Sequence, residues 1–260
     1  MNQGIAYSYQ VTQQEVFIMG GKRIEVAVIE AGGRGRAFGE HIAALPQYAE
    51  VVAVAEPDRQ RREIFAERHN LQKPMVFDSA ESFLAQGKLC DALIIATMDQ
   101  KHVGPAVACT DMGYHMLLEK PMATTLEDCR AIAAAQTRAG TITSVCHSLR
   151  YHKGMARVQQ LVAEGSIGDV MTIDVIEQVA WWHQAHSFVR GNWGREGESA
   201  FMLLAKSCHD IDYIAYLAGV PCRTVSSFGE LSYFKPDNAP EGSTQRCIDC
   251  PLETDCNYSE

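Results

Sequence analysis

The chain has 260 residues, of which 47% are hydrophobic, with a net charge of −9 and a sequence isoelectric point near 5.5. That length and apolar content suffice for one large domain or two moderate domains with their own cores. The acidic balance, with no run of Lys and Arg among aromatic residues, argues against a nucleic-acid partner and favours a small molecule.

The first 22 residues form an N-terminal extension before the first predicted strand. Residues 1–22 have no basic segment followed by a continuous apolar stretch, and nowhere does the chain have about 18 uninterrupted apolar residues. We therefore predict no membrane partner and a cytoplasmic location. The nine cysteines are then expected to be reduced thiols, most of them small core residues.

Residues 23–147 alternate short apolar segments with segments of helical periodicity. The predicted strands are Ile24–Ile29, Val51–Ala55, Met75–Phe77, Ala92–Ala96, His115–Leu118 and Ile142–Cys146. The predicted helices are Arg34–Ala44, Arg59–His69, one beginning at Ser79, Val103–Met112 and Thr125–Ala139. Strands that are apolar on both faces and alternate with helices predict an α/β domain, a doubly wound parallel sheet over residues 23–147.

The pattern changes in residues 148–260. Here we predict helices over Tyr151–Glu164 and Ser199–Leu217, and strands over Val170–Val179 and Thr224–Phe234. These elements predict an α+β domain with an open, mainly antiparallel sheet. Because a two-stranded sheet is marginal in water, we expect this domain to be incomplete and the sequence to be truncated at its C-terminus.

The segment VIEAGGRGRAF, residues 28–38, joins the first predicted strand to the first predicted helix. A dinucleotide-binding turn has the pattern G-x-G-x-x-G, whose second glycine admits the diphosphate and whose third lets the helix pack on the strand. Aligned on that pattern, positions 30, 32 and 35 are Glu, Gly and Gly. We assign the cofactor's phosphates to the following residues of this turn: Gly32, Gly33, Arg34 and Gly35.

Glu30 replaces the first glycine of the pattern. Its side chain crowds the turn and its charge opposes a diphosphate, so we expect impaired cofactor binding, which Arg34 and Arg36 offset by neutralising the carboxylate. The alternative is a chain that no longer binds any nucleotide.

Glu56 ends the second predicted strand, roughly 20 residues after Gly35, at the spacing of the acidic residue that accepts hydrogen bonds from the adenosine ribose. This carboxylate repels a 2′-phosphate, so NAD is the expected cofactor. NADP is the alternative, because arginines that can accept a 2′-phosphate follow Glu56. They are Arg59, Arg61 and Arg62.

Six segments in order resemble the Gfo/Idh/MocA oxidoreductases. They are AGGRGR, AEPD, ALIIATMDQKHV, LLEKPMATT, RYHKGMARVQQLVAEGSIGDV and LLAKSCHDIDYI, spread over residues 23–235. The resemblance implies a Rossmann domain joined to an open antiparallel sheet that holds the substrate and the contacts between subunits. A homo-oligomer is therefore implied, although the short C-terminus leaves its assembly open.

The resemblance also implies roles for residues of the first domain. Lys120 of the EKP segment lies at the end of a parallel strand, where doubly wound sheets bind ligands, and there it orients a hydroxyl or moves a proton. The alternative is a solvated lysine. Pro121 after it is expected in the cis form. The other cofactor contacts implied by these segments are Glu119, Thr97 and His102.

In the segment SCHDID the resemblance assigns His209 to proton exchange with the substrate, and Asp212 lies three residues on, where it can hold the tautomer of the imidazole. The family has an aspartate four residues before this histidine, but here that position is Ala205. Lys206 beside it is expected to orient a substrate oxygen. The alternative for His209 is a packed structural histidine. Residues at the domain junction supply the remaining expected substrate contacts, Arg150 and Tyr151.

Three cysteines near the C-terminus, Cys247, Cys250 and Cys256, have the spacing C-x2-C-x5-C. A closed structural zinc site requires four ligands. With three at hand we predict no metal, the alternative being a fourth ligand from a missing segment or a distant histidine.

The predicted function is that of an NAD(P)-dependent oxidoreductase that transfers hydride between nicotinamide and a sugar, polyol or related hydroxylated metabolite. One alternative, also implied by the resemblance, is a glycosidase that uses tightly held NAD. The other is a catalytically silent protein that senses a nucleotide or sugar, which Glu30 and Ala205 favour.

Overall fold

The computed structural model describes residues 23–195 and 197–259. The predicted N-terminal extension, residues 1–22, lies outside them. The described part contains a six-stranded, wholly parallel sheet in the order β3-β2-β1-β4-β5-β6. Its strands are β1 (Ile24–Ile29), β2 (Ala49–Ala55), β3 (Val76–Phe77), β4 (Ala92–Ile95), β5 (His115–Leu118) and β6 (Thr143–Val145). The strand order reverses between β1 and β4, as in doubly wound sheets, which confirms the predicted fold class.

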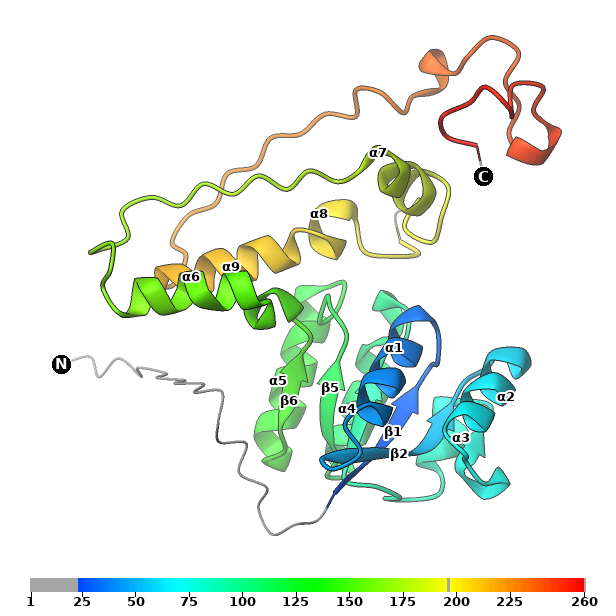
Figure 1. Cartoon of the computed structure of the whole chain (residues 1–260), viewed down its shortest axis with the longest axis vertical. Coiled ribbons are helices and arrows are strands. Elements are labelled where there is room, and N and C mark those ends of the chain that lie inside the picture. Colours follow the sequence, from blue (N-terminus) through cyan, green and yellow to red (C-terminus); the bar gives the residue numbers. More distant parts are fainter. Residues whose placement is uncertain (1–22, 196, 260) are drawn as a thin grey trace.

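Helices follow the strands in alternation and lie against the sheet (Figure 1). They are α1 (Gly33–Ala43), α2 (Arg59–Arg68), α3 (Ala80–Leu84), α4 (Val103–Asp111) and α5 (Leu126–Ala139). Local sequence sets several of their ends. Asp58 and Thr125 each accept a hydrogen bond from a first-turn amide of the helix that follows, and Gly140 ends α5 in the left-handed conformation that glycine adopts without strain.

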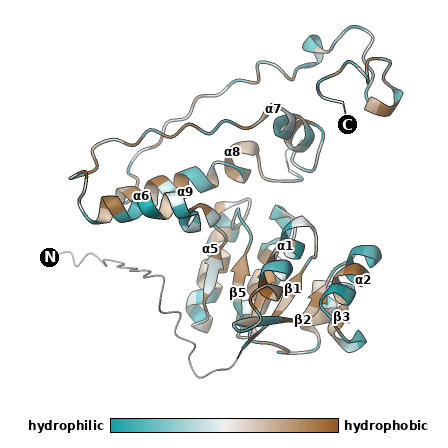
Figure 2. Ribbon diagram, in the orientation of Figure 1, coloured by the Kyte–Doolittle hydropathy of each residue, from teal (hydrophilic) through white to brown (hydrophobic). Residues whose placement is uncertain are grey.

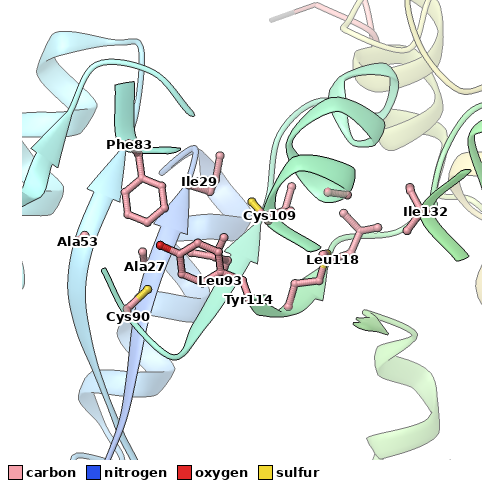
Figure 3. Packing of buried hydrophobic residues seen from close by; sticks show 14 of the residues in the cluster. Ala27, Ile29, Ala53, Phe83, Cys90, Leu93, Cys109, Tyr114, Leu118 and Ile132 are labelled. Carbon is pink, nitrogen blue, oxygen red and sulfur yellow. The ribbon is translucent and has the colours of Figure 1, made fainter. Parts of the chain in front are cut away.

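The two faces of the sheet carry separate cores, because side chains alternate along each strand. Ala27 and Ile29 of β1 pack with Cys109 of α4 and Ile132 of α5 on one face (Figure 3). Val26 and Val28 belong to the other core, where the helices contribute Phe65 and Phe38. Figure 2 shows the strands as apolar and the outer surface of α2 as polar. With both of its faces packed, the sheet holds the ends of its strands in fixed positions, where a functional site can form.

The second region holds four helices in the described residues, and Figure 1 places it beyond one end of the strands. They are α6 (Lys153–Ala163), α7 (Trp181–His183), α8 (Met202–Ala205) and α9 (Cys208–Ala218), with a π-helical turn over Gln184–Val189. The single helix predicted over Ser199–Leu217 is wrong, since Lys206 and Ser207 interrupt it between α8 and α9.

The two strands predicted in this region are also absent. Val170–Val179 and Thr224–Phe234 run as extended segments without strand assignment (Figure 1). Their alternating pattern suits a strand, but a strand also needs a hydrogen-bonded neighbour, and the described residues supply none. Apolar side chains along them lie in solvent, with Met171 86% and Phe228 96% exposed.

Three side-chain contacts position α8 and α9, and the third of them comes from the first region. The guanidinium of Arg150 bonds the carboxylate of Asp212 in α9, and the Tyr213 hydroxyl donates to the carbonyl oxygen of Met155 in α6 at 2.7 Å. The Lys120 ammonium donates to the Ala205 carbonyl at the end of α8. These contacts hold α9 over the end of β5. Among the described helices, not one has both the length and the apolarity that crossing a bilayer demands.

Candidate functional site

The turn between β1 and α1 has the space that a phosphate cradle needs. Gly32 stands in extended conformation at the N-cap of α1. A Cβ added to Gly32 or Gly33 would meet nothing within 4 Å, whereas one added to Gly35 would overlap the carbonyl oxygen of Glu30. Gly35 thus permits the close approach of helix to strand, as the third glycine of a dinucleotide turn does. The helix N-terminus, with its free amides, faces the open side of the turn.

Glu30 adopts the left-handed conformation, with φ of 64°. The conformation costs a residue with a side chain roughly 1–2 kcal/mol, and it allows the turn to form without the first glycine. Burial raises the pKa of the Glu30 carboxyl, and the charge of Glu56 raises it further, while Lys101 and Arg61 oppose this. The cations that act on Glu30 are Lys101 and Arg61, whereas Arg34, one of the two arginines expected to neutralise it, pairs with Glu119.

Glu56 is buried at the end of β2 and ties two loops together. Its Oε2 accepts the amide of Ala31 at 2.7 Å, and its Oε1 accepts the amide of Asp58 at 2.8 Å. A carboxylate has about four acceptor positions, so both oxygens retain capacity for a ribose hydroxyl. The same bonds fix the glycine turn against the start of α2.

Two of the three arginines near Glu56 are already bonded within the chain. Arg59 pairs with Glu63 at 2.8 Å, and Arg62 donates to the carbonyl oxygens of Glu56 and Pro57. Their engagement leaves Arg61 beside two carboxylates, Glu30 and Glu56. A 2′-phosphate would meet more negative than free positive charge here, which supports NAD as the cofactor.

Arg34 crosses from α1 to the end of β5. Its Nε donates to Oε1 of the buried Glu119 at 2.6 Å, and the other carboxylate oxygen accepts the Lys120 amide at 3.0 Å. The charge of Arg34 is thus compensated by Glu119, and both residues brace the turn and the EKP segment. The Lys120–Pro121 peptide bond is cis, in line with the family expectation.

His102 is fully buried and connects the loops after β4 and β5. One ring nitrogen lies 2.9 Å from the Pro121 carbonyl oxygen and the other 3.1 Å from the Thr97 carbonyl oxygen. Both ring nitrogens face protein carbonyls, and the expected contact of His102 with the cofactor stays a prediction. Thr97 keeps a buried Oγ1 that has no partner in the described part of the chain, so it remains a candidate contact.

Lys120 and His209 come together above the end of β5. The Lys120 Nζ donates to the Ala205 carbonyl at 2.9 Å, four residues before His209 along the chain. Burial lowers the pKa of His209, and the charges of Lys120 and His147 lower it further. A neutral imidazole beside a lysine can accept a proton, which is the chemistry expected of a general base.

Asp212 does not hold the tautomer of His209, which corrects that prediction. It takes both side-chain bonds from Arg150, whose Nε and Nη2 lie 2.7 and 2.6 Å from its oxygens, while the buried Nδ1 of His209 has no partner among the described residues. Arg150 also lies over the ring of Tyr216, 4.4 Å from its centroid. Arg150 therefore fastens α9 to the start of the second region, and its expected substrate contact stays a prediction.

Tyr151, also predicted to bind substrate, is 79% exposed. His147, four residues earlier in the sequence, was not predicted as a site residue, yet it lies between His209 and Asp212. Its ring is 5.9 Å from that of His209, edge to face, and its Nδ1 is 3.9 Å from Asp212. Nothing in the local sequence marked His147, because it lies between two of the family segments quoted above, LLEKPMATT and RYHKGMARVQQLVAEGSIGDV.

Lys206 occupies the break between α8 and α9. Burial lowers its pKa, and repulsion from Lys120 lowers it further, while Glu177 opposes both. Burial also lowers the pKa of His183, with contributions from Lys206 and Lys120. Lys120, Lys206 and His183 therefore lie near one another, as the predicted substrate role of Lys206 requires.

A cavity of about 420 Å³ lies in the second region, between residues of the segment 184–202. The volume falls within the range of small-molecule sites. Trp193 in its wall donates from Nε1 to the buried Oδ2 of Asp99 at 2.7 Å, which ties the cavity to the loop after β4. Its lining residues are Gln184, Phe188, Trp193, Gly194, Arg195, Ser199, Ala200, Phe201 and Met202.

The three C-terminal cysteines lie apart from this cluster in Figure 1, at the end of the chain. Arg190 donates to the Cys247 sulfur at 2.9 Å. Across residues 23–195 and 197–259, the side chains of His, Cys, Asp and Glu nowhere form a group of three that could hold a metal ion.

Comparison with known proteins places this geometry in a family. Residues 24–147 match the NAD-binding Rossmann fold of the GFO_IDH_MocA oxidoreductases, and residues 159–254 match the C-terminal alpha/beta domain of the same family. Inositol 2-dehydrogenase of Rubrobacter xylanophilus is 26% identical over 192 residues, covering 74% of this chain and 51% of that protein. The 1,5-anhydro-D-fructose reductase of Ensifer adhaerens is 29% identical over 130 residues, covering 50% and 38%.

Among solved structures, scyllo-inositol dehydrogenase from Lactobacillus casei with bound NAD(H) and scyllo-inositol has a TM-score of 0.65 at 22% identity, covering 76% of this chain and 57% of that one. The chain spans about half or less of the length of the curated relatives it matches. Because the two domain models of one family together cover most of the sequence, the chain belongs to the Gfo/Idh/MocA oxidoreductase family.

Proposed function

We propose that the protein is an NAD-dependent oxidoreductase that transfers hydride between the nicotinamide and a carbinol carbon of a sugar or polyol. The observation that carries the proposal is that the residues expected to bind the cofactor and those expected to move the proton lie at the same edge of the sheet. The glycine turn, Glu56, and the pair of Lys120 and His209 all lie where parallel strands end. Names of relatives support the substrate class, since they include an inositol dehydrogenase and an anhydrofructose reductase.

The residues present fit a dinucleotide. The space at Gly32 and Gly33 admits a diphosphate, and the remaining acceptor capacity of Glu56 suits ribose hydroxyls. When bound, NAD supplies the hydride chemistry that no side chain offers. The chain's own task is to bind, to orient the substrate hydroxyl and to move its proton.

We assign proton transfer to Lys120 and His209, which lie above the end of β5. His209 is neutral at neutral pH because its pKa is lowered by burial and by nearby positive charge, so its imidazole can take the proton of a substrate hydroxyl as that carbon is oxidised. The Lys120 ammonium, held at the Ala205 carbonyl, retains two further N–H bonds that can orient the same hydroxyl oxygen. We assign His209 as the base and Lys120 as the orienting cation.

The test measures cofactor capture and turnover separately. Titration calorimetry with NAD and NADH should give saturable binding, and Gly35→Ala should abolish it because the added methyl meets the Glu30 carbonyl. Gly104→Ala in α4 is the matched control, since a Cβ there meets nothing within 4 Å. Oxidation of inositols and aldoses, followed by NADH absorbance, should be lost in His209→Gln with cofactor binding retained.

A catalytically silent binding protein is the second candidate, because Ala205 stands where the family has an aspartate and Glu30 opposes a diphosphate. Saturable NADH binding without turnover of any sugar or polyol would favour this candidate. Release of a leaving group from a glycoside, with NAD retained, would instead favour the glycosidase.

A further inference from the structure

The C-terminal segment holds two cysteines at the ends of one tight turn. The Cys250 amide donates to the Cys247 carbonyl oxygen at 2.9 Å, which closes a turn over residues 247–250. The end residues of such a turn have Cα atoms within about 7 Å of each other, and disulfides join Cα atoms about 4.4–6.8 Å apart. Both thiols are free and partly exposed. The turn therefore brings two accessible thiols within reach of one disulfide bond.

Cys250 has the surroundings of a reactive thiol. Hydrogen bonds from the backbone of Thr244 and of Leu252 are the main causes of its lowered pKa. Such bonds favour the thiolate, which is the form that attacks an oxidant. The cysteines of the sheet core differ, because burial raises the pKa of Cys90 to about 11 and that of Cys109 to about 12. An oxidant should therefore react at Cys250 before it reacts with these core thiols.

Cys247 connects the turn to the segment that lies against it. Arg190 donates from Nη1 to the Cys247 sulfur at 2.9 Å, and its Nη2 lies 3.2 Å from Nδ1 of His186. A second contact joins the same two parts of the chain, because the ring of Tyr258 meets that of Trp181 edge to face at 5.5 Å. The sulfur of Cys247 is thus the acceptor that holds the Arg190 guanidinium to the C-terminal segment.

The same arginine ends the π-helical turn over Gln184–Val189. Its amide donates to the Ala185 carbonyl oxygen at 3.1 Å. Phe188 and Gln184 of this turn line the cavity of about 420 Å³. Gly191, directly after Arg190, packs so closely on the turn that an added Cβ would overlap the carbonyl oxygen of residue 186. A change at the Cys247 sulfur therefore reaches the wall of the cavity through one side chain.

The described side chains favour a dithiol over a metal site. Cys256 completes the C-x2-C-x5-C spacing. In the part of the chain that the structure describes, however, no three side chains of His, Cys, Asp or Glu form a group that could hold a metal ion. A structural zinc site needs four ligands, whereas a disulfide needs only two neighbouring thiols.

We propose that Cys247 and Cys250 are a peroxide-sensitive dithiol, and that their oxidation to a disulfide releases Arg190 and loosens the cavity wall. The Cys250 thiolate attacks one oxygen of the peroxide and breaks the O–O bond, which gives a sulfenic acid and hydroxide. The Cys247 thiol then attacks the sulfenic sulfur, and its proton leaves with the hydroxyl group as water. Two thiols are oxidised and one peroxide is reduced by two electrons. A disulfide sulfur cannot become a thiolate, so it is a weaker partner for a guanidinium.

The first experiment identifies the bond. The reduced full chain is treated with hydrogen peroxide, the remaining thiols are alkylated, and the chain is digested with trypsin and with a protease specific for glutamate. Cleavage after Arg246 and Glu253 separates Cys247 and Cys250 from Cys256. We expect the peptide between these two cleavage sites to carry a disulfide and no alkyl group, while Cys256 is alkylated. Dithiothreitol should reverse the oxidation.

Three variants assign the chemistry. Cys250→Ser should leave no disulfide in this peptide, and Cys247→Ser should stop the reaction at the sulfenic acid of Cys250, which dimedone traps. Cys222→Ser, at an exposed cysteine outside the turn, is the matched control and should leave the disulfide unchanged. Circular dichroism spectra and melting temperatures confirm that each variant is folded.

Limited proteolysis with chymotrypsin, which does not cleave at arginine, measures the effect on the cavity wall. Cleavage within residues 184–202 should be roughly fivefold faster in the oxidised chain, the effect of losing one hydrogen bond where cleavage follows local opening. Arg190→Met should give the same increase in the reduced chain, and oxidation should then add nothing. Arg130→Met, at an exposed arginine of α5, should change neither rate.

Peroxide that oxidises Cys222 or Cys256 as readily as Cys247 and Cys250 overturns the inference. So does a chain that carries bound zinc and whose thiols react only after a chelator has removed the metal. A disulfide that leaves the cleavage rate unchanged refutes the link through Arg190. Because none of these measurements uses a cofactor or a substrate, their outcome is independent of the proposed function.

Discussion

Asp212 holds Arg150 with both carboxylate oxygens, at 2.7 and 2.6 Å, and so fastens α9 to the residues that follow β6. The aspartate side chain is 15% exposed and the arginine 38%. A bidentate pair in partly buried surroundings is stronger than an exposed one. The role of Asp212 is thus to fix the position of the helix that carries His209.

This pair predicts a measurable coupling in stability. In a double-mutant cycle with Arg150→Met and Asp212→Ala, we expect a coupling free energy of unfolding of about 1–3 kcal/mol. The exposed pair of Arg59 and Glu63, at 82% and 62% side-chain exposure, is the control and should couple by no more than about 0.5 kcal/mol. Urea denaturation measures both cycles, and equal coupling in the two would contradict the structural role of Asp212.

The pH behaviour of His209 provides a second prediction. Burial, Lys120 and His147 lower its pKa below the ordinary 6.5, against opposition from Glu119 and Asp210. A base of lowered pKa stays unprotonated to more acidic pH, so oxidation should rise with pH along a limb whose midpoint is below 6.5. Stability should fall as pH drops through the same range, since the unfolded chain binds the proton more readily.

An NMR titration of the His209 ring tests this directly, with the signal assigned by its loss in His209→Gln. In Lys120→Met the pKa should move upward, because one source of repulsion is removed. Lys73→Met, at an exposed lysine in another part of the chain, should leave it in place. A midpoint at or above the ordinary value in the unmodified chain would show that burial and charge do not act on this imidazole as the structure indicates.

A third prediction concerns the link between Trp193 and Asp99. The indole donates at 2.7 Å to a carboxylate that is 5% exposed, so its loss leaves a buried charge without this partner. Trp193→Phe should lower the free energy of unfolding by about 1–3 kcal/mol. It should also speed proteolytic cleavage within residues 184–202. Trp182→Phe, at a ring 53% exposed, is the control, and identical effects of the two variants would rule out the indole's hydrogen bond as the cause.

The sheet could be predicted because the sequence signals that specify it are local. Apolar segments, helix caps and glycines each act within a few residues, and β5 at His115–Leu118 agrees with its predicted bounds. The glycine turn and Glu56 were found in the same way, since their spacing along the chain reflects one βαβ unit. The residues proposed to bind the cofactor could therefore be picked out from the sequence.

The hydrogen-bond and strand partners of residues in the second region could not be predicted, because these residues lie far apart in the sequence. Asp212 and His209 share a helical face, but Arg150, 62 residues away in sequence, takes the carboxylate. Likewise, the alternation in Val170–Val179 favours a strand, and only a neighbouring segment decides whether it becomes one. His147 carried no spacing signal, so its place beside His209 required the structure.

Glu30 leads to the last prediction, which separates its charge from its backbone strain. Glu30→Gln removes the charge and keeps a side chain at φ of 64°, whereas Glu30→Gly removes both. If repulsion of the diphosphate dominates, both variants should bind NAD a few-fold more tightly, and the unmodified chain should gain affinity as pH falls, because the raised pKa lets Glu30 take up a proton earlier than an ordinary glutamate. Calorimetry at a series of pH values measures this, with Glu40→Gln on the exposed surface of α1 as the control. Tighter binding in the glycine variant alone would assign the effect to the backbone.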